Sequence, residues 1–138
     1  MQMQFSRTCD YAIRAALVLA DGARHKSKDV AEEAGIPPAF APQVLGHLVR
    51  AGIVASTAGQ RGGYRLCRQP DEVTLLDLIE AMEGPLKSTR CVLSDASCNA
   101  SAPCTVHEHW YRAQDVLRGS LTSTTLQMLL GRDLRVKP

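Results

Sequence analysis

The fold is decided by residues 27–66, SKDVAEEAGIPPAFAPQVLGHLVRAGIVASTAGQRGGYRL. The first part of this stretch predicts a short helix that ends at Gly35, because glycine adopts the left-handed conformation common at helix ends. An Ile-Pro-Pro turn at residues 36–38 separates it from a second helix, which ends at Gly52. Two short helices joined by a glycine-containing turn form a helix-turn-helix.

The two helices of this motif have different start signals. Ser27 is the expected N-cap of the first helix. The second begins at Pro38 or nearer Pro42, because a start at Pro38 suits a first turn but leaves Pro42 just inside the helix, where it removes a backbone hydrogen bond. The apolar face of the second helix consists of Phe40, Val44, Leu45, Leu48 and Val49.

Two β-prone runs follow, at residues 53–57 and 64–67, and they flank a glycine-rich tip that carries Arg61. This pattern predicts an antiparallel hairpin. A hairpin directly after a helix-turn-helix is a wing. The expected fold class is therefore mainly α: a winged helix-turn-helix with a small β-hairpin wing and a long C-terminal helix.

Helices are also predicted on both sides of this unit. Before it, a helix capped by Ser6 or Thr8 ends at the Asp-Gly pair at residues 21–22. After it, Thr74 and Asp77 have the spacing of a capping box and open a further helix.

The C-terminal part predicts a long helix and a short one. Thr105 and Glu108 have the spacing of a second capping box, which opens the long helix, and Thr124 is the expected cap of the short one. The long helix needs a partner for its apolar stripe, which consists of Val106, Trp110, Ala113, Leu117 and Leu121.

Composition limits the class of protein. A chain of 138 residues fits one domain with a moderate core. No apolar run approaches the roughly 18–20 residues that cross a bilayer, and the first residues do not resemble an export signal, so a cytoplasmic protein without membrane contact is expected. Five cysteines without such a signal argue against a disulfide framework. No nucleophile–base set or phosphate loop indicates an enzyme.

The strongest chemical signal is residues 91–107, CVLSDASCNASAPCTVH, which hold three cysteines and a histidine among small polar residues. Thiolates and imidazole are the ligands that soft or borderline metals prefer, and so short a segment can fold around one centre. The candidate ligands are Cys91, Cys98, Cys104 and His107. Cys9 and Cys67 stand alone in apolar patterns and are expected to be small core residues.

Four features, in one order, resemble the Rrf-type bacterial transcription regulators, the IscR-, NsrR- and RirA-like iron–sulfur winged-helix proteins. They are CDYAIRA at residues 9–15, RAGIV at 50–54, RGGYRL at 61–66, and the three clustered cysteines. The resemblance spans nearly the whole chain. It implies a homodimer that binds palindromic operators in double-stranded DNA.

The resemblance also implies a division of the chain into three regions. Residues 1–84 form the DNA-binding domain, residues 85–104 the cysteine-rich cluster-binding loop, and residues 105–138 the dimerisation helix with a C-terminal helix. The implied function is a regulator or repressor whose operator affinity depends on an iron–sulfur cluster that senses redox state, nitric oxide or iron–sulfur supply. The alternative is a cluster-free regulator of the same fold that uses cysteine thiols or a structural zinc.

The resemblance gives two candidates for a fourth cluster ligand. His107 is separated from Cys104 by two residues, the spacing of the histidine ligand in the IscR-like branch. Asp10 aligns with the aspartate that the NsrR-like branch donates from the opposite subunit. We favour His107, because both its spacing and its residue type fit. A [2Fe–2S] cluster is preferred and a [4Fe–4S] cluster is the alternative.

DNA contacts are expected from three places. Ser27 and Lys28 lie at a helix N-terminus, where backbone N–H groups favour phosphate. Many family members carry an arginine immediately before the wing glycine, where this chain has Ala58. Arg61 at the wing tip is the candidate that replaces it as the minor-groove probe. The solvent-facing candidates of the recognition helix are Ala39, Gln43, His47 and Arg50, and Gln43 is suited to a bidentate contact with adenine.

Overall fold

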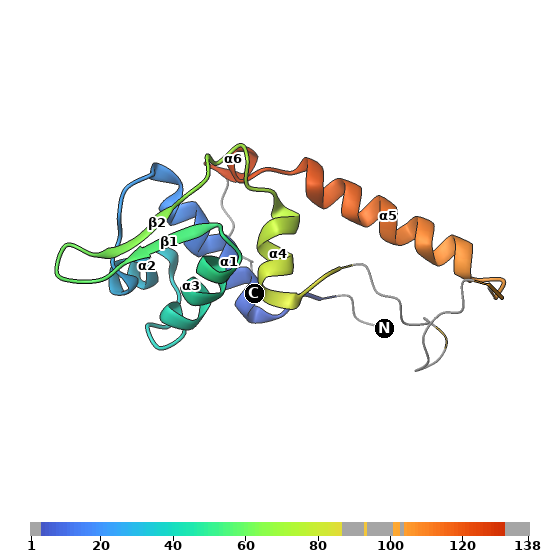
Figure 1. Cartoon of the computed structure of the whole chain (residues 1–138), viewed down its shortest axis with the longest axis horizontal. Helices are drawn as coiled ribbons and strands as arrows, with labels where there is room; N and C mark the ends of the chain where they lie inside the picture. Colours follow the sequence, from blue (N-terminus) through green and yellow to red (C-terminus); the bar gives the residue numbers. More distant parts are fainter. Residues whose placement is uncertain (1–3, 87–92, 94–100, 103, 132–138) are drawn as a thin grey trace.

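The structure is a computed structural model that describes residues 4–86, 93, 101–102 and 104–131. The described chain is mainly helical, with one antiparallel β-hairpin (Figure 1), which confirms the expected fold class. The elements, in order, are α1 (Arg7–Val18), the 3₁₀ helix η1 (Leu19–Asp21), α2 (Ser27–Ala34), α3 (Ala41–Arg50), β1 (Val54–Thr57), β2 (Gly63–Leu66), α4 (Leu75–Glu83), α5 (His107–Ser123) and α6 (Leu126–Leu129).

Small side chains let α1 lie at the centre of the molecule. Ala12, Ala15 and Ala16 are fully buried, so that α2, α3 and α4 can each pack closely against α1. The larger core side chains of α3 lie on one face, as the periodicity predicts. Full burial of a leucine such as Leu45 or Leu48 contributes about 1.5–3 kcal/mol, which fixes α3 against this core.

The recognition helix α3 begins at Ala41, with Pro42 in its second position, so the later of the two predicted starts is correct. Pro38 belongs to the turn that precedes the helix. Phe40, which was expected on the buried face, is 45% exposed. Because it precedes the helix, it does not follow the helical phase, and its ring rests instead beside Tyr11, with ring centroids 6.1 Å apart.

The capping signals succeed in one place and fail in others. The capping box of Thr74 and Asp77 is present, with both reciprocal bonds at 3.0 Å. Ser27 is not an N-cap: it is the first helical residue of α2, after an extended Lys26. The hydroxyl of Ser6, the residue before α1, makes no capping bond.

The predicted caps of α5 and α6 are also wrong, because their polar groups have other partners. Glu108 accepts from Arg112, four residues on, and no side chain caps the start of α5. The Thr124 hydroxyl donates to the carbonyl of Ser120, and Thr125 caps α6 instead.

The predicted hairpin is confirmed: the wing is a four-residue ladder in which Val54 pairs with Leu66 and Thr57 with Gly63. Its return requires Gly62, because a Cβ there would lie 2.0 Å from the carbonyl oxygen of Thr57. Val54 and Leu66 are buried, so the base of the wing packs on the core while its tip projects into solvent (Figure 1).

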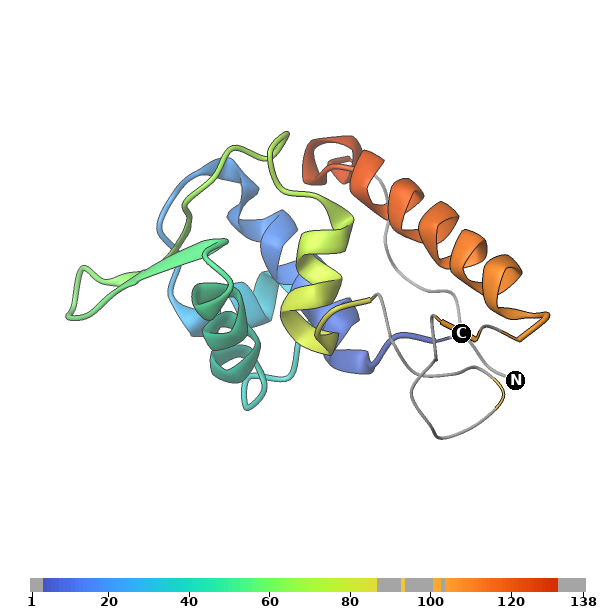
Figure 2. The same ribbon diagram turned by 45° about the vertical axis from the view of Figure 1, so that its right-hand side comes forward.

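Helix α5 extends away from the helix-turn-helix and the wing, and α6 returns the chain to the core (Figures 1 and 2). The return is fixed by two backbone bonds of 2.8 Å, from Leu75 to Thr124 and from Leu126 to Val73. Within α5, six residues before Thr124, Arg118 forms an ion pair of 3.0 Å with Glu80 of α4. The end of α5 is therefore tied to α4 and the core.

Within the described parts of the chain, no helix combines the length and apolarity needed to cross a bilayer.

Candidate functional site

Three predicted base-reading residues lie on one face of α3. Gln43, His47 and Arg50 are spaced by four and three residues, which places them above one another along the helix. Gln43 and Arg50 are exposed and His47 is half-buried. Ala39 is exposed as well, but it lies in the turn before α3. This face can therefore present an amide, an imidazole and a guanidinium to a groove of DNA.

The predicted phosphate contacts lie at the start of α2. Lys28 is the second residue of this helix and is exposed, whereas Ser27 is the first and is half-buried. Helix α2 packs against α3, as the first helix of a helix-turn-helix does. Its N-terminal backbone N–H groups and the Lys28 ammonium together favour an anion.

The wing presents Arg61 in an exposed tip. The segment before α2, residues 21–25, runs beside the wing, whereas the sequence predicted only that a helix ends at residues 21–22. Arg24 of this segment donates from Nη1 to the Arg61 carbonyl at 3.2 Å. No local signal in the sequence could have revealed this contact, because it joins residues 37 positions apart.

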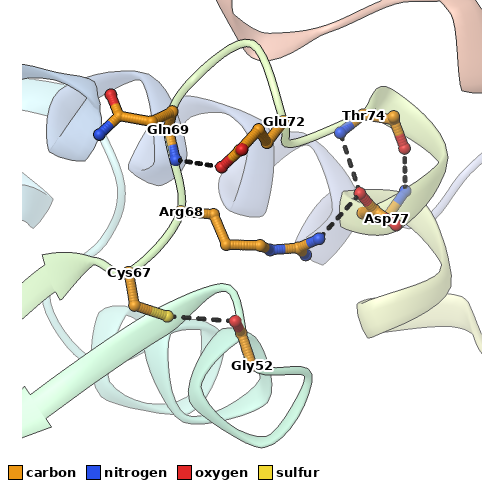
Figure 3. A network of polar contacts seen from close by, with 7 residues as sticks. All are labelled: Gly52, Cys67, Arg68, Gln69, Glu72, Thr74 and Asp77. Carbon is orange, nitrogen blue, oxygen red and sulfur yellow. Dashed lines mark hydrogen bonds and ion pairs between the residues drawn. The ribbon is translucent and has the colours of Figure 1, made fainter.

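Polar contacts tie the exit of the wing to α4 (Figure 3). Arg68 forms an ion pair with Asp77, with Nη1 and Oδ2 3.5 Å apart. Cys67, expected in the core, is exposed, and its thiol donates to the Gly52 carbonyl at 3.1 Å. Because Leu66 points inward at the end of β2, alternation along the strand turns Cys67 outward.

The candidate metal ligands are only partly described. Cys91 and Cys98 lie outside the described residues. Cys104 is exposed, and its carbonyl accepts a hydrogen bond of 3.1 Å from the backbone N–H of His107. One turn therefore joins the backbones of Cys104 and His107 at the start of α5. The His107 ring stacks on Tyr111, with ring centroids 4.4 Å apart.

The alternative ligand, Asp10, has a partner in its own helix. Its Oδ1 accepts from Nε of Arg14 at 3.0 Å, one turn farther along α1. The guanidinium already compensates the charge of this carboxylate.

Cys9 is a buried core residue, as expected. Burial, together with the negative charges of Glu83 and Asp10, raises the pKa of its thiol from 9.0 to about 11. The thiolate is the reactive form of cysteine, so Cys9 is protected both by burial and by protonation. Because only the unfolded chain releases this proton near pH 9, Cys9 stabilises the fold below that pH, and this contribution is lost as the pH rises through about 11.

We expect alkylation to separate Cys9 from Cys67. Iodoacetamide at pH 8 should label Cys67 in the native protein and should label Cys9 only after denaturation, as measured by mass spectrometry of the two peptides. Equal labelling rates in the native protein would contradict the buried, protonated state of Cys9.

An exposed recognition face on α3, a helix N-terminus beside it and an arginine-tipped wing define a DNA-binding winged-helix protein. Residues 5–132 match the Rrf2 family, described as iron-dependent transcriptional regulators. The chain belongs to this family of DNA-binding transcriptional regulators, which confirms the resemblance in its sequence.

Three relatives illustrate the match. A protein of Aquifex aeolicus named as an HTH-type transcriptional regulator is 33% identical over 93% of this chain and 92% of its own. CymR, the global cysteine regulator of B. subtilis, superposes with a TM-score of 0.73 at 27% identity, over 93% of this chain and 96% of its own. T. potens IscR gives a TM-score of 0.71 at 26% identity, over 94% and 87%. Relatives of this kind are transcriptional regulators, not enzymes.

Proposed function

We propose that this protein is a homodimeric regulator whose operator affinity is controlled by an iron–sulfur cluster that senses redox state, nitric oxide or iron–sulfur supply. The observation that carries this proposal is the set of three cysteines within residues 91–104, which leads directly into His107 and α5. The family's description as iron-dependent regulators supports it.

The donor set has the chemistry that a cluster requires. Cys91, Cys98 and Cys104 supply three thiolates, the usual ligands of iron–sulfur clusters. The turn between Cys104 and His107 supports His107 as the fourth ligand, because its backbone hydrogen bond brings the main chains of these two residues close together. The ion pair of Asp10 with Arg14 argues against Asp10 in that role. When bound, a cluster supplies one-electron redox chemistry, at a potential that an imidazole ligand raises.

The dimer is proposed to form along α5. Val116 is 74% exposed, and Trp110, Leu117 and Leu121 are half-buried on a helix that projects from the core (Figure 1). A second copy of this helix would cover that apolar surface. Because α5 begins three residues after Cys104 and ends at the core, a change in the cysteine segment can shift the population of dimer arrangements.

The DNA contacts are proposed as follows. The α3 face reads bases in the major groove, the start of α2 binds phosphate through Ser27 and Lys28, and Arg61 enters the minor groove. The α3 readers are Ala39, Gln43, His47 and Arg50.

Replacing Gln43 with alanine is expected to relax base choice. A bidentate amide–adenine contact contributes about 1–3 kcal/mol of discrimination, so the preference for adenine at one position of each half-site should disappear. The measurement is selection of bound duplexes from a random DNA library by wild-type and variant proteins. An unchanged consensus would exclude Gln43 as a base reader.

Iron and sulfide analysis of anaerobically purified protein tests the cluster. We expect brown protein with visible absorption and about two iron atoms per subunit for a [2Fe–2S] cluster. His107→Ala should lower the iron content, and Asp10→Ala should not. Colourless protein without iron would refute the cluster, and the reverse order of the two variants would move the fourth ligand to Asp10.

The second candidate is a cluster-free regulator of the same fold that uses cysteine thiols or a structural zinc. The similarity to CymR, a cysteine regulator, favours this alternative, as do the exposed thiols of Cys67 and Cys104. Zinc accepts the same ligands as a cluster but gives no colour, so metal analysis on the same sample separates the two functions.

A further inference from the structure

The segment from Asp21 to His25 lies along the outer edge of the wing. His25 and Tyr64 exchange two backbone hydrogen bonds, of 2.9 and 2.7 Å, so that His25 extends the two-stranded sheet by one residue pair. The approach is so close that a Cβ on Gly63 would lie 2.6 Å from the carbonyl oxygen of His25. We name residues 21–25 the strap.

The strap is itself held in place by Asp21. The Asp21 carboxylate accepts from the Ala23 N–H at 2.9 Å and contacts Nε2 of His25 at 2.9 and 3.0 Å. Desolvation raises the pKa of this carboxyl, but the bonds from Ala23 and His25 outweigh it and leave the pKa below its ordinary value. The strap therefore joins the end of α1, through η1, to the wing by a short and well-bonded path.

Arg24 projects from the strap to the wing tip. Its Nη1 donates to the Arg61 carbonyl at 3.2 Å, and both residues are exposed. Among the described residues, no carboxylate lies within ion-pair distance of either guanidinium. Two uncompensated cations that share one tip favour an anion there, which DNA phosphates provide.

We propose that Arg24 is a positioning residue of the wing, which holds the Arg61 backbone so that the Arg61 side chain is presented to the minor groove. The proposal rests on the role given above to Arg61 in DNA binding. Without this bond, the tip between β1 and β2 keeps the ladder, the His25–Tyr64 pair and the turn bond of 3.0 Å from the Gly62 N–H to the Gly59 carbonyl. None of these bonds is made by Arg61 itself, so Arg61 must be ordered at the moment of binding. That ordering lowers affinity.

A double-mutant cycle tests the proposal. The affinities of wild type, Arg24→Met, Arg61→Met and the double variant are measured at one fixed salt concentration, with a 30-base-pair duplex that wild-type protein has selected from a random library. We expect each single variant to bind roughly tenfold more weakly and the double variant to bind little more weakly than Arg61→Met, because the two residues act through one contact. Arg24→Lys, which keeps a cationic donor, should restore most of the affinity.

Two comparisons separate positioning from general effects. Arg7→Met removes the same charge at the far end of α1 and should leave affinity unchanged within about twofold. The loss from Arg24→Met should be greatest when the sequence beside the wing is A·T-rich, since a narrow minor groove attracts arginine most strongly, whereas a loss of stability would affect all sequences equally.

The outcomes distinguish the two levels of the proposal. Two results would overturn the positioning role and leave Arg61 as a DNA contact. One is wild-type affinity of Arg24→Met. The other is a double variant whose fold-loss of affinity equals the product of the two single losses. Wild-type affinity of Arg61→Met would overturn the wing contact itself, and the positioning role with it.

Discussion

Replacing Cys104 with alanine is expected to abolish iron binding by the anaerobically purified protein and to make its operator affinity insensitive to oxidants and nitric oxide. Three thiolates in one segment leave no spare ligand among them, so the loss of one should prevent stable cluster assembly. Iron and sulfide content, visible absorption and DNA affinity before and after oxidant are the measurements.

Cys67→Ala is the matched control for this variant. Cys67 is also an exposed thiol, but it lies at the exit of the wing and bonds to the Gly52 carbonyl. Its variant should keep full iron content. If Cys104→Ala retains iron while Cys67→Ala loses it, the proposed ligand set is wrong.

Truncation of Leu126 to alanine is expected to destabilise the whole helix-turn-helix. Leu126 comes from the short helix α6, yet it is fully buried in the same cluster as residues of α1 and α3. Removal of such a side chain leaves a cavity and costs about 2–5 kcal/mol, a large part of the roughly 5–15 kcal/mol that stabilises a typical domain. Urea unfolding followed by circular dichroism measures this change in the free energy of unfolding.

Met128→Ala gives the comparison within the same helix. Met128 is 55% exposed, so its truncation should change the free energy of unfolding by less than about 1 kcal/mol. If Leu126→Ala changes the free energy of unfolding as little as Met128→Ala does, α6 does not belong to the core.

The fold was predictable because the residues that end its helices and form its hairpin turn act locally. Gly35 and Gly52 both adopt positive φ at the helix ends where the sequence placed them, and the glycine-rich run at the wing tip marks the hairpin. The chain beyond Gly52 then has only a short distance in which to form the two strands. Each of these signals depends on the backbone conformation of a single glycine. Because glycine adopts positive φ readily, its place in the sequence indicates directly where a helix ends or the chain turns.

The errors arise where contacts between distant segments decide the local structure. Ser27 lost its predicted capping role because the strap pairs His25 with Tyr64, and the chain remains extended as far as Lys26 before the helix begins. The burial of Leu126 likewise depends on the return of the chain after α5. Neither contact leaves a periodic pattern in the sequence.

The candidate site was predictable as a set of residue types and only partly as an arrangement. The α3 face followed from helical spacing, and it places Gln43 and Arg50 in solvent as expected. The position of Arg24 beside Arg61 could not be inferred, because it depends on the path of the strap. Cys67 shows the opposite case: its apolar neighbours in the sequence suggest a core residue, whereas strand alternation after the inward Leu66 turns it outward.

The anchoring of α5 at one end makes this helix a lever arm in the dimer proposed above. Its 17 residues span roughly 25 Å, and the bonds at Thr124 and Arg118 fix the end nearer the core. A tilt of about 5° about this anchored end moves the opposite end of α5, next to Cys104, by about 2 Å relative to the core. In the proposed dimer, a small movement at the cysteine segment is thereby coupled to the angle between the paired helices and the core, and so to the spacing of the two α3 helices against half-sites roughly 34–36 Å apart.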